Sequence, residues 1–227
     1  RKLLATGGGT CNLTNLHVSV DRFHGAKPAF TAPVLTTWPA AAVMAFFDEI
    51  GIPCLAEPDG RVYPCGAQAS AVQDALRLEA QRRGVVTMCG FDVGAVRVRD
   101  PILLEDTPLY AQRPFELTAS DGRLVRSSQL IVATGGPAAP QLGGCDAGHR
   151  LLASLGHRST RLLPAIVQIT TDIPFVNSLS GIRVQGVVTL LRKGKPVRTE
   201  KGEILFADYG LSGPAPLQLG GMVSRLM

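Results

Sequence analysis

The chain has 227 residues, enough for one large domain or for one domain with a smaller second one. Its 45% hydrophobic and 18% charged residues allow a buried core and exclude global disorder. No apolar run is long enough to span a membrane, and the first apolar stretch breaks into glycines too soon for a signal peptide. We therefore expect a cytoplasmic globular protein without a membrane partner.

Charge and cysteine usage narrow the classes of function further. The net charge is +5, but the cations are spread along the sequence, with no basic helix and no interleaved aromatic residues, so we expect no nucleic-acid partner. Only this net charge motivates the hypothesis of a module that binds anionic ligands or nucleic acid. The five cysteines form no CxxC pair and the four histidines lack ligand spacing, which predicts reduced thiols and no metal site.

Hydrophobic periodicity predicts an α/β arrangement in the first two thirds of the chain. Helices are expected at residues 39–50, 68–83 and 147–155. Strands are expected in a hairpin around the turn 58–60, in a buried run at 85–89, in an antiparallel meander of about three strands over 91–126, and in an apolar run at 129–136. The last run is typical of a central parallel strand, whose carboxyl end is where ligands bind in open α/β sheets.

The pattern changes after Pro164. Short β-type runs predict antiparallel strands at 165–170, 183–192, 195–199 and 203–206, with Gly194 and Gly202 in turns, and a helix follows from Pro214. We therefore divide the chain into two domains, an α/β domain at 1–162 and a β-rich domain at 163–227 that ends in a helix.

The sequence begins with a glycine-rich segment that has two interpretations. Gly7, Gly8 and Gly9 follow a basic pair and precede small hydroxyl and amide residues. Three glycines let the backbone bend and approach another group closely, which suits a phosphate or a polar cofactor edge. A surface loop without a ligand is the alternative interpretation.

Four stretches, in order along the chain, resemble the HI0933-like family of NAD(P)/FAD-dependent oxidoreductases, which are flavoproteins with two dinucleotide-binding domains. These stretches are Arg1–Asn15 (RKLLATGGGTCNLTN), Gly60–Pro64 (GRVYP), Ile131–Gly136 (IVATGG) with Leu155–His157 (LGH), and Gly202–Phe206 (GEILF) with Gly210–Pro214 (GLSGP). The resemblance implies an incomplete FAD-binding Rossmann-like α/β domain containing an antiparallel β-meander, together with an inserted antiparallel β-barrel-like domain. The family's N-terminal GxGxxG segment and its C-terminal part have no counterpart in this sequence.

The resemblance also implies where FAD would lie. The cofactor-binding positions carried over from the family are Arg1, Lys2, Thr6, Gly7, Gly8, Gly9, Cys11, Asn12, Asn15, Val93, Ala133, Thr134, Gly135, Gly136 and Asp146. Two of them have structural alternatives. The Cys11 thiol is either at the flavin edge or buried and inert, and Asp146 is either a ligand of a cofactor hydroxyl or a helix N-cap.

The resemblance implies a function without naming its substrate. The full-length protein is expected to be an FAD-dependent oxidoreductase that transfers hydride through the flavin to or from a small organic substrate, with NAD(P)H as a candidate electron donor. No catalytic side chains stand out, and the sequence leaves the oligomeric state open. The alternative is a truncated or degenerate FAD-domain fragment that acts as a noncatalytic binding or folding module.

Overall fold

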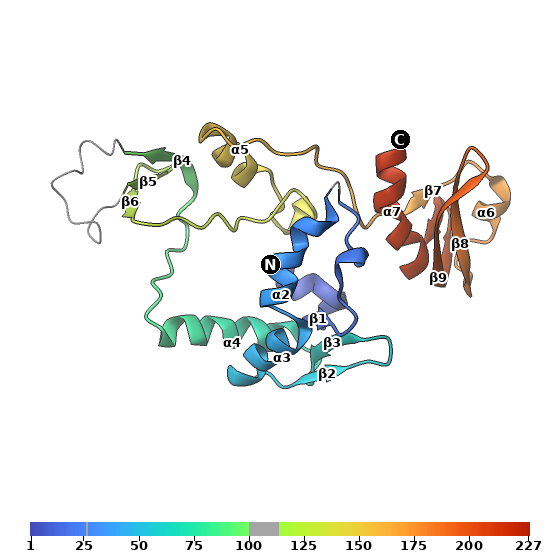
Figure 1. The fold of residues 1–227 in the computed structure, drawn as a ribbon, viewed down its shortest axis with the longest axis horizontal. Coiled ribbons are helices and arrows are strands. Elements are labelled where there is room, and N and C mark those ends of the chain that lie inside the picture. Colours follow the sequence, from blue (N-terminus) through green and yellow to red (C-terminus); the bar gives the residue numbers. More distant parts are fainter. Residues whose placement is uncertain (26, 100–113) are drawn as a thin grey trace. The chain divides into compact units, whose positions relative to one another are not determined.

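The computed structural model describes residues 1–25, 27–99 and 114–227 (Figure 1). Two compact units make up the chain. The first comprises Arg1–Phe23 with Lys27–Ser159, and the second comprises Thr160–Met227, with which residues 24–26 are grouped. The expected domains 1–162 and 163–227 stay a prediction, because compactness alone does not define a folding domain.

The first unit combines short helices with two small sheets. Its α-helices are α1 (Lys2–Ala5), α2 (Ala32–Thr37), α3 (Ala40–Glu49), α4 (Ala69–Arg82) and α5 (Ala147–Ser154). Its 3-10 turns are η1 (Thr6–Gly9), η2 (Val20–Arg22), η3 (Pro28–Thr31) and η6 (Pro140–Leu142). Its strands are β1 (Thr14–Asn15), β2 (Cys54–Ala56), β3 (Arg61–Pro64), β4 (Val93–Val98), β5 (Phe115–Ala119) and β6 (Leu124–Ser127).

Every strand pairing in the described residues is antiparallel. One sheet has the order β1-β3-β2 and the other the order β4-β5-β6, the meander that the sequence predicts. The predicted helices are confirmed as α3, α4 and α5, and the predicted hairpin as β2 and β3. Helix α2 was not predicted, and the short strand β1 adds a third member to the hairpin.

Two predicted strands of the first unit are wrong. The run at 85–89 and the run at 129–136 both follow irregular paths. Several of their apolar side chains are open to solvent, since Val86 is 83% exposed and Ile131 is 89% exposed. A strand needs a neighbour to satisfy its backbone groups, and no described segment pairs with either run. Composition alone therefore marked both runs as β-forming, although neither run has a strand partner in the described residues.

The core of the first unit forms where helix α4 meets the segment after the glycines. Val72 is fully buried and Ala69 nearly so, on one face of α4. They pack with Cys11 and Ile52, and the half-buried Phe47 and Leu76 extend the cluster. Helix α3 ends just before Ile52, so the cluster fastens both helices to the N-terminal segment.

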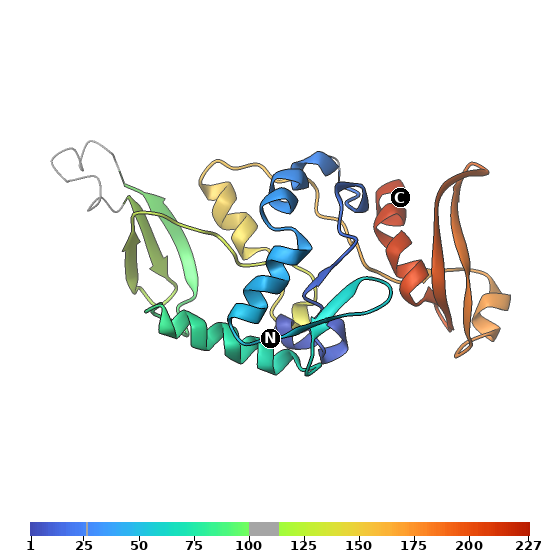
Figure 2. The same ribbon diagram turned by 60° about the horizontal axis from the view of Figure 1, so that its bottom comes forward.

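The second unit is a four-stranded sheet with one long helix packed on it. Its elements are β7 (Ile169–Thr170), α6 (Pro174–Ser178), β8 (Arg183–Arg192), β9 (Lys195–Ala207), β10 (Gly210–Ser212) and α7 (Pro214–Leu226). The strand order is β7-β10-β9-β8. Helix α7 lies against the sheet beside β9, as Figure 2 shows from a second direction. Its Ala215 and Leu219 are buried.

Three expectations for this unit need correction. The sheet is open, so a closed barrel-like insert is not present in the described residues. Gly202 lies inside β9 rather than in a turn, because β9 runs unbroken from Lys195 to Ala207. Strand β7 is limited to two residues of the predicted 165–170 run, because its partner β10 is itself only three residues long.

No single helix in the described residues is long and apolar enough to cross a membrane. The pair Pro28–Thr37 and Ala40–Glu49 meets the length and composition criteria only when taken together, and it bends by 44°.

Removing the buried Val72 side chain tests the core. Val72→Ala is expected to lower the free energy of unfolding of the first unit by about 2 kcal/mol, because the helix keeps its shape and a void replaces two methyl groups. Leu78→Ala on the same helix is the matched control, since Leu78 is 66% exposed. Trp38 is the single tryptophan and lies in the first unit, so its fluorescence in urea follows that unit. Equal effects of the two substitutions would contradict this core.

Candidate functional site

The glycine-rich segment forms a left-handed turn directly after α1. Gly7, Gly8 and Gly9 have φ values of 57°, 66° and 98°. Other L-residues adopt this region at a cost, so the three glycines are required by the path of the backbone. An added Cβ at Gly8 would meet nothing within 4 Å, so this part of the turn is open to a ligand.

Cys11 completes the turn and anchors it. It also has a positive φ of 63°, and its backbone N–H donates to the Thr6 carbonyl over 3.0 Å. Cys11 is only 4% exposed and packs in the core cluster with Ile52 and Val72. The side chain therefore has the buried packing role, and a contact with a cofactor would fall to the backbone at this position.

Two asparagines fasten the segment after Cys11 to strand β3. The Asn12 side-chain amide donates to the carbonyls of Val62 and Thr14, both over 3.3 Å. Asn15 lies in β1 opposite Arg61, and its side-chain oxygen accepts from the His17 N–H over 2.8 Å. These bonds fix the backbone that follows the glycine turn, so both asparagines have a structural role in this arrangement.

A lysine joins helix α1, which directly precedes the glycine turn, to the second glycine-containing loop. The Lys2 ammonium donates to the Gly136 carbonyl over 2.9 Å, across 134 positions of sequence. The same ammonium lies within 3.0 Å of the point where a Cβ on Gly144 would stand. Three backbone segments that the sequence separates therefore meet around one positive charge.

The loop at 133–136 is seated on helix α5. A Cβ on Gly148 would stand 1.9 Å from the Thr134 hydroxyl oxygen, so this helix position accepts only glycine while Thr134 stays in place. Asp146 occupies the N-cap position of α5, yet its carboxylate pairs with Arg150 and makes no capping bond. Gly144 and Gly148 were not among the predicted site residues, although their spacing of four across Asp146 was a visible signal.

The remaining predicted positions are placed less directly. Arg1 is exposed, and the Thr6 hydroxyl donates to the Leu3 carbonyl over 2.7 Å, closing α1. Ala133 and Gly135 are exposed in the loop beside Thr134. Val93 begins strand β4, which packs against α5, and is paired with Ala119. The structure thus joins Lys2 directly to Gly136, while the role of each position toward a cofactor stays a prediction.

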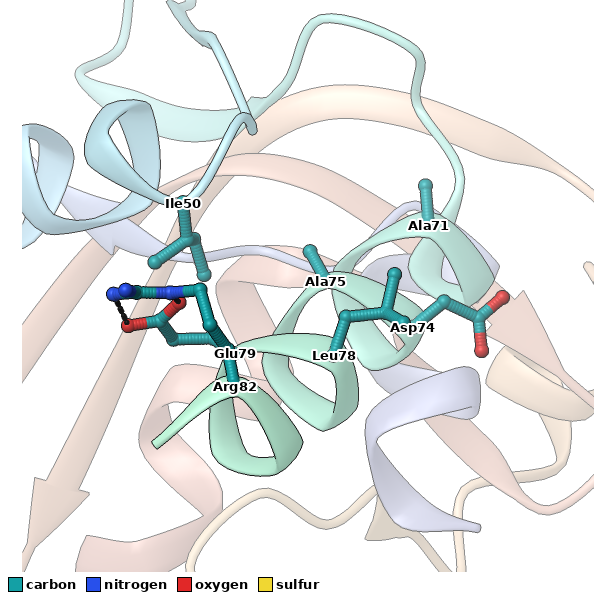
Figure 3. A pocket seen from close by; sticks show the side chains of 7 residues that line it. All are labelled: Ile50, Ala71, Asp74, Ala75, Leu78, Glu79 and Arg82. Carbon is teal, nitrogen blue, oxygen red and sulfur yellow. Dashed lines mark hydrogen bonds and ion pairs between the residues drawn. The ribbon is translucent and has the colours of Figure 1, made fainter. Parts of the chain in front are cut away.

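A separate pocket of about 330 Å³ lies along helix α4 (Figure 3). Its wall combines Ile50, Ala75 and Leu78 with the charged residues Glu79 and Arg82. Arg82 donates to both Glu79 oxygens over 2.7 and 2.8 Å, and Arg83 also pairs with this carboxylate. The Glu79 carboxylate is therefore neutralised by two arginines, while Asp74 is a further charged residue of the lining.

The chemistry available to the chain is that of binding rather than of a catalytic triad. The glycine-containing loops offer backbone groups, and Lys2 adds a positive charge beside the second loop. Such a surface suits the anionic and polar edge of a dinucleotide. Among residues 1–25, 27–99 and 114–227, no cluster of three or more His, Cys, Asp or Glu side chains could hold a metal ion.

Comparison with known families identifies this arrangement. A family model described as the HI0933-like protein Rossmann domain matches residues 1–222. The chain belongs to the HI0933-like family. In the described residues, all strand pairs of its Rossmann-like α/β unit are antiparallel. The runs at 85–89 and 129–136, which the sequence predicted as strands, have no strand partner there.

Curated relatives of this HI0933-like chain include proteins with two different names. A 3-dehydro-bile acid delta(4,6)-reductase from Clostridium scindens is 29% identical over 226 residues, which are 99% of this chain and 52% of the relative. Ribosomal RNA dihydrouridine synthases from Escherichia coli and Haemophilus influenzae are 28% and 29% identical, each over 96% of this chain and over 51% and 52% of their own lengths. The chain thus spans about half the length of these relatives.

Adding one methyl group tests how the 133–136 loop is seated. Gly148→Ala is expected to displace Thr134, lower the free energy of unfolding by about 2 kcal/mol and speed amide exchange in the loop. Gly136→Ala is the control, since its Cβ would meet nothing within 4 Å. Thr134→Gly in the Gly148→Ala background should restore protection in hydrogen-exchange mass spectrometry. Unchanged exchange in Gly148→Ala would mean that the loop is seated elsewhere.

The ion pairs in the α4 pocket predict a pH dependence. Hydrogen bonds from Arg82 and Arg83 lower the pKa of Glu79 from 4.5 to about 2. Because the folded pKa lies below the ordinary value, the pairs stabilise the fold above pH 4.5 and lose this effect as the pH falls toward 2. A carboxyl ¹³C titration should show this low midpoint, and Arg82→Gln should raise it while Arg77→Gln on the same helix leaves it in place. A Glu79 midpoint near 4.5 in the unaltered chain would refute the pairing.

Proposed function

We propose that this protein is an FAD-dependent oxidoreductase that reduces a carbon–carbon double bond in a small organic substrate. The observation that carries the proposal is the Lys2–Gly136 hydrogen bond, which joins helix α1, directly before the glycine turn, to the 133–136 loop and places a positive charge beside that loop. Membership of the HI0933-like family supports an oxidoreductase with a dinucleotide cofactor. When bound, FAD would supply the hydride, with NAD(P)H as the candidate donor to it.

The residues of the first unit fit such a cofactor. At Gly8 the left-handed turn leaves open space where a side chain would otherwise stand, and Gly135 and Gly136 do the same on the second loop. Lys2 would hold helix α1 to the 133–136 loop and favour the anionic part of the cofactor. Gly148 would keep Thr134 in its position at the edge of the loop.

The names of the relatives support the type of bond reduced. A delta(4,6)-reductase of a 3-dehydro-bile acid and a dihydrouridine synthase both describe the gain of hydrogen by a carbon–carbon double bond near a carbonyl group. The carbonyl accepts electron density as hydride adds, which makes such a double bond an electrophile. We therefore propose a conjugated enone or a similar ring as the substrate class.

A second candidate function is reduction of a uridine ring within RNA. It is favoured by the charge of the second unit, where residues 160–227 contain eight Lys and Arg against four Asp and Glu. Two of the relatives bear the corresponding name. The two candidates share the same bond chemistry and differ in the size and charge of the molecule that carries it.

Flavin spectroscopy tests the leading candidate. The protein as encoded in its gene is reduced anaerobically, and the oxidised flavin band is followed after addition of cyclohex-2-enone or of cyclohexanone. We expect the band to return only with the enone, because cyclohexanone lacks the double bond. Return with neither compound, or equally with both, would count against the proposed reaction.

Lys2 supplies a test of the cofactor site itself. Lys2→Met should weaken FAD binding about tenfold, because the hydrogen bond from helix α1 to the 133–136 loop and its positive charge are lost. Lys27→Met is the matched control, since Lys27 is exposed and lies outside both loops. Isothermal titration with FAD measures the difference. Equal affinities of the two variants would remove Lys2 from the site.

A further inference from the structure

The β8–β9 hairpin concentrates positive charge at one exposed end of the second unit. The two strands meet in a two-residue turn, Lys193-Gly194, flanked by the facing pair Arg192 and Lys195. Every residue from Leu191 to Val197 is exposed. Three cations therefore occupy four consecutive positions at the end of the two-stranded ribbon seen in Figures 1 and 2.

These charges are not neutralised by the ribbon. The two glutamates of β9 are already engaged, Glu203 by Arg183 over 3.0 Å and Glu200 by Arg198. Across the described ranges, Arg192, Lys193 and Lys195 form no ion pair. A cluster of this kind favours a partner that brings several negative charges close together.

The same three residues are poor choices for the stability of a hairpin. Arg192 and Lys195 stand directly opposite one another, where like charges repel. Lys193 has a φ of 51°, in a turn where both central positions are left-handed and Asn or Gly is preferred. Residues that weaken the element they belong to are expected at functional positions.

We propose that this tip, Arg192–Lys195, binds the phosphate backbone of RNA. The inference rests on the second candidate function above, and it names the surface that would hold the RNA. A membrane surface fits less well, since binding there depends on aromatic or long apolar side chains beside the cations. The tip has no aromatic residue and only Leu191 and Val197 beside it. The proposal is at odds with the expectation from sequence, which treated the cations as scattered.

Neutralising the tip without straining it gives the test. The variant Arg192→Gln/Lys193→Asn/Lys195→Gln removes three charges and places the preferred Asn in the turn. The control Lys27→Gln/Arg77→Gln/Arg158→Gln removes three exposed charges elsewhere in the chain. Binding of each protein to a fluorescent, uridine-containing RNA stem-loop is measured by anisotropy over a range of salt concentrations, without FAD or reductant.

The tip variant is expected to bind RNA at least about tenfold more weakly. Its slope of log binding constant against log salt concentration should be shallower by about two to three. Its thermal stability should equal or exceed that of the unaltered chain, which separates lost binding from lost folding. The control variant should bind within about twofold of the unaltered chain.

Three results would overturn the proposal. They are no RNA binding at low salt, an equal loss in both variants, and preferential binding of the tip to phosphatidylserine vesicles over RNA. Flavin binding and enone reduction, measured on the same tip variant, report separately on the proposed reaction. If enone reduction fails while RNA binding is intact, the proposed reaction is wrong. If RNA binding fails while enone reduction is intact, the proposed RNA surface is wrong.

Discussion

The burial of Cys11 is the constraint on which the first unit depends. Its side chain enters the core only because the backbone reverses through four left-handed residues, Gly7–Gly9 and Cys11 itself. At the other end of this segment, Lys2 of helix α1 donates to the Gly136 carbonyl. A hydrophobic contact and a charged hydrogen bond thus fix the two ends of one short segment. The open glycine surface between them follows from this arrangement.

Local sequence signals predicted most of the regular elements. Helices α3, α4 and α5 were visible because apolar residues recur at helical spacing, with Gly51, Gly84 and Gly156 just beyond their ends. The hairpins formed by β2 with β3 and by β8 with β9 were visible because turn residues separate β-forming runs. Each of these signals is contained within a few neighbouring residues.

Features that depend on distant partners were missed. The runs at 85–89 and 129–136 have strand composition, but a strand exists only where another strand accepts its hydrogen bonds. Gly202 was expected to end a strand, yet the long partner β8 carries β9 straight through it. At the candidate site, family resemblance identified the loops, whereas the contact of Thr134 with Gly148 required coordinates. Long-range packing is the feature that a single sequence predicts least well.

The unpaired runs at 85–89 and 129–136 have a consequence for the polypeptide in solution. Val85, Val86 and Ile131 present apolar side chains to water on segments without proline. Their backbone groups have no strand partner in the described residues, so two molecules could satisfy one another by pairing these runs edge to edge. Self-association of this kind depends on concentration, whereas folding of a single chain does not.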